Sequence, residues 1–142
     1  MKFKIILFPL SIVLLHAQPM TNEKFIKYKQ MAPQVLDTIN NQTKTIISCF
    51  EHEKSIQNIN ECSSKTGKPV ETMIRKLIPK QLNKLCKKDS NVKLKFIWSN
   101  QNYESLITGL NKTVSENERN KKCIQESKSI EIYAKCLVES KV

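Results

Sequence analysis

Four of the five cysteines form two copies of one motif, and their spacing indicates disulfide chemistry. Twelve residues separate Cys49 from Cys62 and Cys123 from Cys136, and a Lys-Ser-Ile triplet lies at matching offsets in both copies. Such cysteines would lie roughly 19 Å apart in a straight helix, whereas a disulfide needs Cα atoms within about 7 Å. A bonded chain must therefore reverse at the serine, which can cap the returning helix. The motif predicts a disulfide-stapled helical hairpin, used twice.

Cys86 is the cysteine that this pairing leaves unbonded. Five cysteines allow several connectivities, and the repeat favours the two bonds described above. Lys84, Lys87 and Lys88 flank Cys86, and nearby cations lower a thiol's pKa and raise its reactivity. Three interpretations stay open. One is a thiol-active redox or mixed-disulfide role, including a dimer through Cys86. The second is a buried or partly buried free thiol placed by the apolar face of Leu82 and Leu85, and the third is a disulfide in a pairing other than the one that the repeat favours.

Positive charge is concentrated in the segment from Arg75 to Lys95. The chain has 24 lysines and arginines against 13 acids, and this segment holds eight of the cations against Asp89 alone. Such a surface attracts anionic partners, which include acidic lipid headgroups, polyanionic glycans and acidic proteins. The alternative is a solvated lysine face with no partner. The candidate binding residues are Arg75, Lys76, Lys80, Lys84, Lys87, Lys88, Lys93 and Lys95.

Other classes of function lack the residues they need. Bidentate contacts to nucleic acid depend mainly on arginine, and the chain has only Arg75 and Arg119. Beyond the first seventeen residues His52 is the single histidine, whereas zinc catalysis and nucleophile–histidine arrangements depend on that residue type. Glycine-rich phosphate loops and calcium-loop motifs are missing too. We therefore expect a non-enzymatic protein with no cofactor, no metal site and no nucleic-acid partner.

Residues 1–17 predict a secretory signal peptide. Lys2 and Lys4 precede an apolar run from Ile5 to Leu15, and a plausible cleavage site follows. The run is shorter than the ~20 residues that a bilayer span needs, so we expect no transmembrane segment. The sequence thus predicts a secreted or periplasmic protein, in a compartment that permits disulfides. Residues 18–142 are expected to form a single helical domain.

Apolar residues recur at three- and four-residue spacing over most of the chain, which is typical of amphipathic helices. Pro33 suits a first helical turn, and Gly67 suits a helix end. Ser115 and Glu118 form a capping-box pattern, which predicts a helix start ahead of Cys123.

Two stretches depart from this pattern. Pro79 should kink or divide the helix around it. Lysines at four-residue spacing would line one stripe if that helix continued; they are Lys76, Lys80, Lys84 and Lys88. Val92–Trp98 alternates with a strand period. Because a single strand has no partner in this chain, we expect an extended connection or a helix start there.

Together the patterns predict an all-α fold, a small helical bundle of four to six helices built from two disulfide-stapled hairpins. The paired cysteines resemble those of coiled-coil-helix-coiled-coil-helix proteins, whose spacing is shorter, and the resemblance implies no functional residue. The leading hypothesis is an exported, non-enzymatic binding or structural protein whose basic surface engages an anionic partner. The rival hypotheses are a thiol-active protein using Cys86 and a cationic protein that perturbs membranes.

Overall fold

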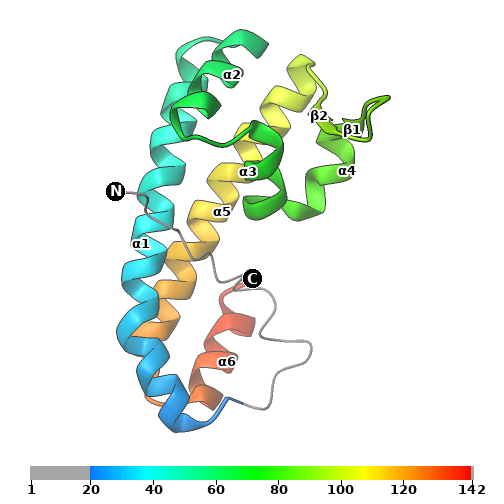
Figure 1. The fold of residues 1–142 in the computed structure, drawn as a ribbon. Helices are drawn as coiled ribbons and strands as arrows, with labels where there is room; N and C mark the ends of the chain where they lie inside the picture. Colours follow the sequence, from blue (N-terminus) through cyan, green and yellow to red (C-terminus); the bar gives the residue numbers. More distant parts are fainter. Residues whose placement is uncertain (1–19, 142) are drawn as a thin grey trace.

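The structure is a computed structural model that describes residues 20–141; the predicted signal peptide, residues 1–17, lies outside this range. Figure 1 shows two long helices side by side, with the shorter elements packed against them. In chain order the elements are α1 (Asn22–His52), α2 (Ile56–Lys65), α3 (Val70–Leu77), the 3₁₀ helix η1 (Pro79–Gln81), α4 (Leu82–Leu85), β1 (Cys86–Lys88), β2 (Leu94–Phe96), α5 (Asn100–Glu126) and α6 (Ile130–Glu139). The predicted all-α fold is confirmed, with one short two-stranded hairpin added.

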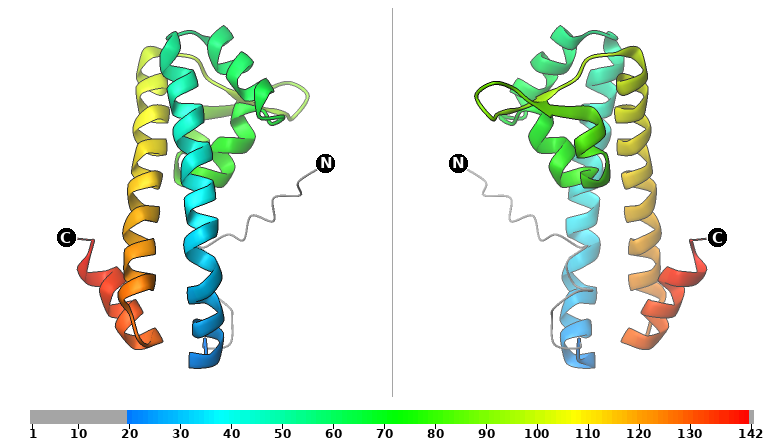
Figure 2. Two further views of the ribbon diagram at one scale, coloured as in Figure 1. Left: turned by 90° about the vertical axis from the view of Figure 1, so that its left-hand side faces the viewer. Right: turned by 90° about the vertical axis from the view of Figure 1, so that its right-hand side faces the viewer.

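α1 and α5 are antiparallel and form the most extensive helix pairing of the fold (Figure 2). Near the middle of the pair, buried Asn40 accepts a hydrogen bond from the Asn117 amide at 2.9 Å and donates one to the Val114 carbonyl at 3.4 Å. A buried amide is costly unless it is hydrogen-bonded. Because Asn40 finds both partners only in this alignment, it fixes how far one helix is shifted along the other.

Each long helix turns back through a disulfide, and the predicted cysteine pairing is confirmed. Cys49–Cys62 joins α1 to α2 with the Cα atoms 5.9 Å apart, and Cys123–Cys136 joins α5 to α6 with the Cα atoms 5.7 Å apart. Cys86 is the free cysteine of the described residues. Structural disulfides of this kind indicate an oxidising, extracellular type of environment.

The serine between each pair of cysteines caps the returning helix, as predicted. The Ser55 hydroxyl accepts from the Asn58 N–H at 3.1 Å, and the Ser129 hydroxyl accepts from the Ile132 N–H at 3.3 Å. Each hydroxyl satisfies one of the backbone donors that a helix start leaves without a partner. The two elbows therefore share one local construction.

The two hairpins lie at opposite ends of the long helix pair. In Figure 1, α2 packs near the upper end of α1, and α6 packs near the lower end of α5. The chain between the hairpins, from α3 through β2, forms a small lobe on one side of the upper half (Figures 1 and 2). The repeated motif thus forms the two ends of the molecule. The chain between the repeats adds the lobe at the end where α2 lies, and no such lobe lies at the end where α6 lies among the described residues.

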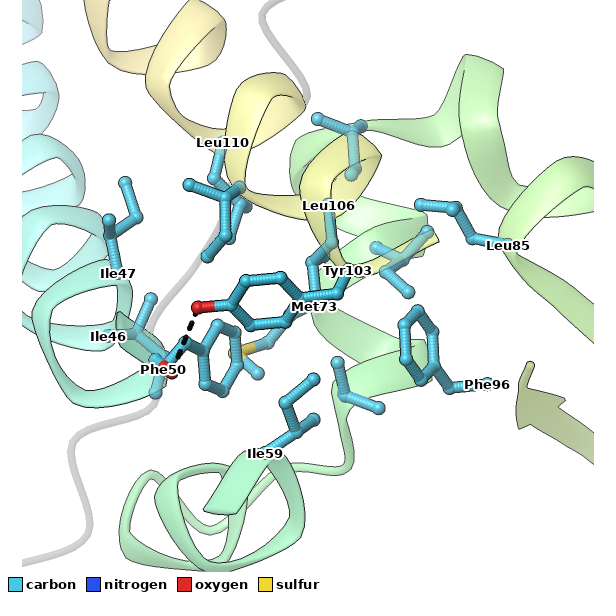
Figure 3. Packing of buried hydrophobic residues seen from close by; sticks show 14 of the residues in the cluster. Ile46, Ile47, Phe50, Ile59, Met73, Leu85, Phe96, Tyr103, Leu106 and Leu110 are labelled. Carbon is cyan, nitrogen blue, oxygen red and sulfur yellow. Dashed lines mark hydrogen bonds between the residues drawn. The ribbon is translucent and has the colours of Figure 1, made fainter. Parts of the chain in front are cut away.

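Two clusters of buried side chains hold these parts together. The larger cluster lies between the upper halves of α1 and α5, α2 and the lobe (Figure 3). Within it the Tyr103 hydroxyl donates to the Phe50 carbonyl at 3.2 Å, so the one polar atom of that ring is satisfied. The smaller cluster lies at the other end, where Phe25 of α1 packs 5.5 Å from Tyr133 of α6, measured between ring centroids.

Two predicted helix boundaries are wrong. Pro33 lies inside α1, which begins earlier because Thr21 caps it and Phe25 is buried. Ser115 and Glu118 lie inside α5, which runs unbroken past them. In both places packing against residues far along the chain overrides a local signal that would otherwise start a helix.

The expectation for Val92–Trp98 is also wrong. Leu94–Phe96 pairs antiparallel with Cys86–Lys88. The partner strand was not predicted, because it directly follows a segment whose apolar residues have helical spacing. Gly67 ends its helix as predicted, with a positive φ of 71° just after α2. Within residues 20–141, no helix combines the length and the apolar character that a bilayer span requires.

Candidate functional site

The predicted basic residues lie together on the lobe formed by residues 70–96, which we call the basic lobe. All eight cations of the Arg75–Lys95 segment are exposed. Of these eight cations, only Lys95 has a carboxylate of the described residues within 4 Å, that of Asp89 at 3.4 Å. The other seven cations have solvent-facing charges that no side chain neutralises, and they give the lobe a strong positive potential.

The lysines do not line one helical stripe, because the helix does not continue through Pro79. α3 ends at Leu77, and Ile78 leaves the helical region with φ −136° and ψ 54°. A residue before proline is biased towards extended conformations, and proline has no N–H to donate to the helix. The basic residues are instead distributed over α3, η1, α4, both strands and the hairpin turn between them.

The two acids of the basic lobe are engaged by backbone groups. Glu71 accepts a hydrogen bond from the Phe96 N–H at 2.8 Å, which ties α3 to β2. Asp89 accepts from the N–H groups of Asn91 and Lys93 at 2.9 and 3.0 Å. The Lys93 N–H is the main cause that holds the pKa of Asp89 below its ordinary value. Both carboxylates thus shape the lobe, and they leave all of its cations except Lys95 without an ion-pair partner in the described part of the chain.

The hairpin carries lysine on both strands. Lys87 and Lys95 lie directly opposite each other, and like charges at such a position destabilise an antiparallel pair. At the tip, Val92 has φ 60° and is 69% exposed. That backbone region disfavours β-branched residues. An anion bound between the ammonium groups of Lys87 and Lys95 would offset their repulsion. Contact with an apolar surface would bury the Val92 side chain.

Cys86 is buried, with 3% of its surface exposed, and it faces the core opposite Phe96. Burial is the main cause that raises the pKa of the Cys86 thiol to about 11, and the nearby Glu71 carboxylate contributes to this rise. The expectation that neighbouring lysines lower this pKa is wrong. Strand alternation places Lys87 on the opposite face, and the loss of hydration dominates. The thiolate, which is the reactive form, is therefore scarce at neutral pH.

A cavity of about 520 Å³ lies between α1, α2 and α3. Its apolar wall consists of Ile39 and Ile46 from α1, Met73 and Leu77 from α3, and the Cys49–Cys62 disulfide. The volume lies within the range of about 300–1,000 Å³ that small-molecule sites occupy. The cavity exists because the disulfide holds α2 against α1 while the Gly67 turn leads the chain away to α3.

Three lysines line the same cavity: Lys65, Lys68 and Lys76. Its lining contains no carboxylate. Burial lowers the pKa of Lys68, and the ammonium of Lys76 lowers it further. Lys76 belongs to the predicted basic segment, whereas Lys65 and Lys68 precede it and were not predicted. They flank Gly67, and their placement depends on a turn that brings two helices together.

His52 is exposed in the last turn of α1. Within residues 20–141, no group of three or more histidine, cysteine or acidic side chains is placed to hold a metal ion. Two features that could bind a ligand are the basic lobe and the lysine-lined cavity beside it. No protein-family model, no curated protein and no solved structure matches the chain.

Proposed function

We propose that the protein is an exported, non-enzymatic binding protein that docks onto an acidic lipid surface through its basic lobe. Export is supported by the signal-like residues 1–17 and by two disulfides. Residues 18–142 contain a single histidine, the residue that most often serves in acid–base catalysis and often in metal sites. This composition favours a binding role over a catalytic one.

One observation carries the proposal: seven exposed cations of the basic lobe have no carboxylate within 4 Å among the described residues. Elsewhere on the molecule lysines form ion pairs, such as Lys44–Glu118 at 2.8 Å and Lys121–Asp37 at 2.7 Å. A lysine near an acidic membrane contributes about 1 kcal/mol to binding. Several such lysines on one lobe are enough for stable attachment.

The tip of the hairpin favours lipid over a glycan or an acidic protein as the partner. Val92 is exposed at the tip, and Lys87, Lys88, Lys93 and Lys95 lie on the adjoining strands and turn. Interfacial segments combine apolar residues with lysine or arginine, because the former enter the acyl boundary while the latter meet the headgroups. A purely ionic partner would leave the valine unused.

Sedimentation with lipid vesicles tests the proposal. Residues 18–142 should bind vesicles of phosphatidylcholine and phosphatidylglycerol, should not bind phosphatidylcholine alone, and should dissociate as salt screens the charges. Charge reversal of four lobe lysines should weaken binding by at least about 100-fold, at about 1 kcal/mol for each lysine. The variant carries Lys80→Glu, Lys84→Glu, Lys87→Glu and Lys88→Glu.

The matched control reverses four exposed lysines at the far end of the long helices: Lys24→Glu, Lys27→Glu, Lys122→Glu and Lys128→Glu. It has the same net charge as the lobe variant and should retain most of the binding. Equal loss in both variants would mean that only net charge matters, and it would overturn the proposal. Binding to a sulfated glycan or an acidic polypeptide without binding to vesicles would overturn the choice of lipid.

A further inference from the structure

We propose that the cavity between α1, α2 and α3 binds one long-chain fatty acid, with its chain on the apolar wall and its carboxylate on Lys65, Lys68 and Lys76. This inference rests on the proposed function in one respect, because both assign unneutralised lysines to an acidic lipid. It goes further in assigning a site for a single molecule in a cavity that borders the basic lobe and shares Lys76 with it.

The apolar wall fits an acyl chain. Ile46 and Met73 of the lining are buried, whereas Ile39, Leu77 and Cys49 are half-buried. Burying one methylene raises affinity by about fourfold. Affinity that accumulates in this way favours a long unbranched chain over a compact polar ligand.

The threonines of the lining do not compete with the lysines for the head group. Thr43 donates its hydroxyl hydrogen to the Ile39 carbonyl at 2.7 Å, Thr45 donates to Asn41, and Thr66 donates to Ser63. Each hydroxyl hydrogen is used by the backbone of its own helix or helix end. Recognition of a charged head group therefore falls to the ammonium groups, with the neutral amides of Asn41 and Gln42 as the other donors of the lining.

The three lysines lack any other anion. None of them lies within 4 Å of a carboxylate among the described residues. Lys68 is half-buried and lies near Lys76, so its charge is both poorly hydrated and repelled. A carboxylate at this place would offset both effects. The positive charge of the cavity thus complements the carboxylate of a fatty acid, and the apolar wall complements its acyl chain.

Displacement of a fluorescent fatty acid tests the site directly. Dansylaminoundecanoic acid should bind residues 18–142 with one site per chain, and oleate should displace it at concentrations on the order of 1 μM. Octanoate should compete at least 100-fold less well, because it buries fewer methylenes. Oleyl alcohol should also compete at least tenfold less well. Equal competition by the alcohol, stronger competition by lysophosphatidate, or no probe binding would each overturn the proposal.

Two matched pairs of variants locate the site. Thr45→Trp places a large side chain in the cavity and should abolish binding of the fluorescent fatty acid and of oleate. Thr38→Trp alters an exposed threonine of the same helix outside the cavity and should leave this binding unchanged. Both threonines donate to the carbonyl four residues earlier, so the pair is matched in lost hydrogen bonds. Unchanged oleate affinity in Thr45→Trp would contradict the site.

The second pair removes charge without filling space. Lys68→Gln with Lys76→Gln should weaken oleate binding by about tenfold or more, whereas Lys80→Gln with Lys84→Gln should leave it unchanged. The four-lysine reversal of the basic lobe should also leave oleate binding intact. If this reversal variant loses vesicle binding and retains oleate binding, the result supports the cavity as the fatty-acid site. Vesicle binding with no oleate binding overturns the cavity alone.

Discussion

Val92 carries the clearest local strain in the molecule. Its φ of 60° lies in the left-handed region, and it is exposed at the hairpin tip. That conformation costs an L-residue about 1–2 kcal/mol. Replacement by glycine removes this cost, but it also increases the conformational entropy of the unfolded chain, which offsets part of the gain in stability. Val92→Gly should therefore raise the free energy of unfolding by about 1 kcal/mol in urea titration. The same variant should bind acidic vesicles more weakly, because the apolar tip is gone.

A matched variant separates these two effects. Ser90→Gly alters an exposed residue of the same turn whose φ is not positive, and it should be neutral or slightly destabilising. Lower stability of Val92→Gly than of the natural protein would show that the valine makes contacts that outweigh its strain. Stronger vesicle binding by Val92→Gly would contradict a role for the tip in lipid docking.

Cys86 provides a prediction about pH. Its pKa rises from the ordinary 9.0 to about 11, mainly through burial. A folded-state pKa above the unfolded one gives stability that is fully present below pH 9 and is lost as the pH rises towards 11. Iodoacetamide should label Cys86 slowly at pH 8 in the native protein and rapidly in urea, as mass mapping would measure. Native labelling at the rate of a free cysteine would instead favour the thiol-active alternative.

At the scale of elements, the two elbows differ at the position three residues after each capping serine, and this difference has a structural consequence. The side-chain amide of Asn58 lies within 3.0 Å of three carbonyl oxygens at the end of α1, those of Cys49, Phe50 and Glu53. The second elbow has Ile132 at this offset, and it is half-exposed. Asn58→Ala should lower the free energy of unfolding by about 2 kcal/mol, because three carbonyls lose this donor and only those of Phe50 and Glu53 keep another among the described residues.

Ile132→Ala is the matched substitution in the other elbow. It removes no hydrogen bond and little buried surface, and urea unfolding should change by less than about 0.5 kcal/mol. A similar loss of stability in both variants would mean that helix propensity, and not the amide, explains the first result. The comparison isolates one side chain within two elbows of the same construction.

Sequence patterns predicted the elements well where the signal is local and covalent. The cysteine spacing and the capping serines specify each elbow within a short stretch, and both were confirmed. The boundaries at Pro33 and Ser115 were wrong, because packing against residues far along the chain decides them. Phe25 before Pro33 packs on Tyr133 of α6, and no local pattern contains that contact.

The hairpin was missed for a related reason. Cys86–Lys88 follows directly on a short helix, and its three residues are too few for a strand period to be recognised. Only pairing with Leu94–Phe96 defines it as a strand. A turn through Val92, in place of the glycine or asparagine that such positions favour, concealed the hairpin further.

At the scale of the whole molecule, the two repeated hairpins act as a scaffold and the chain between them carries the charge. The charged segment was predicted because a count of lysines does not depend on the fold. The cavity was not predicted, since its walls come from three helices and its lysines lie on both sides of a turn. Its sequence signal was limited to lysines flanking Gly67.

This division of roles predicts that the far hairpin contributes stability and not binding. Cys123→Ala with Cys136→Ala removes the staple of α6, which lies away from the basic lobe (Figure 1). Closing a loop of this length stabilises by about 3 kcal/mol, so urea unfolding should shift by about that amount. Vesicle affinity of the folded variant should stay within about twofold. A parallel loss of vesicle binding would show that the two ends are not independent.

Hydrogen–deuterium exchange with acidic vesicles tests most directly whether the basic lobe is the binding surface. The protein should be compared with and without phosphatidylglycerol vesicles at low salt, with peptides that separate the hairpin from α6. Lobe docking predicts slower exchange in residues 86–96 and unchanged exchange in residues 130–139. Protection of α6 with an unprotected hairpin, or no protection at saturating lipid, would contradict it.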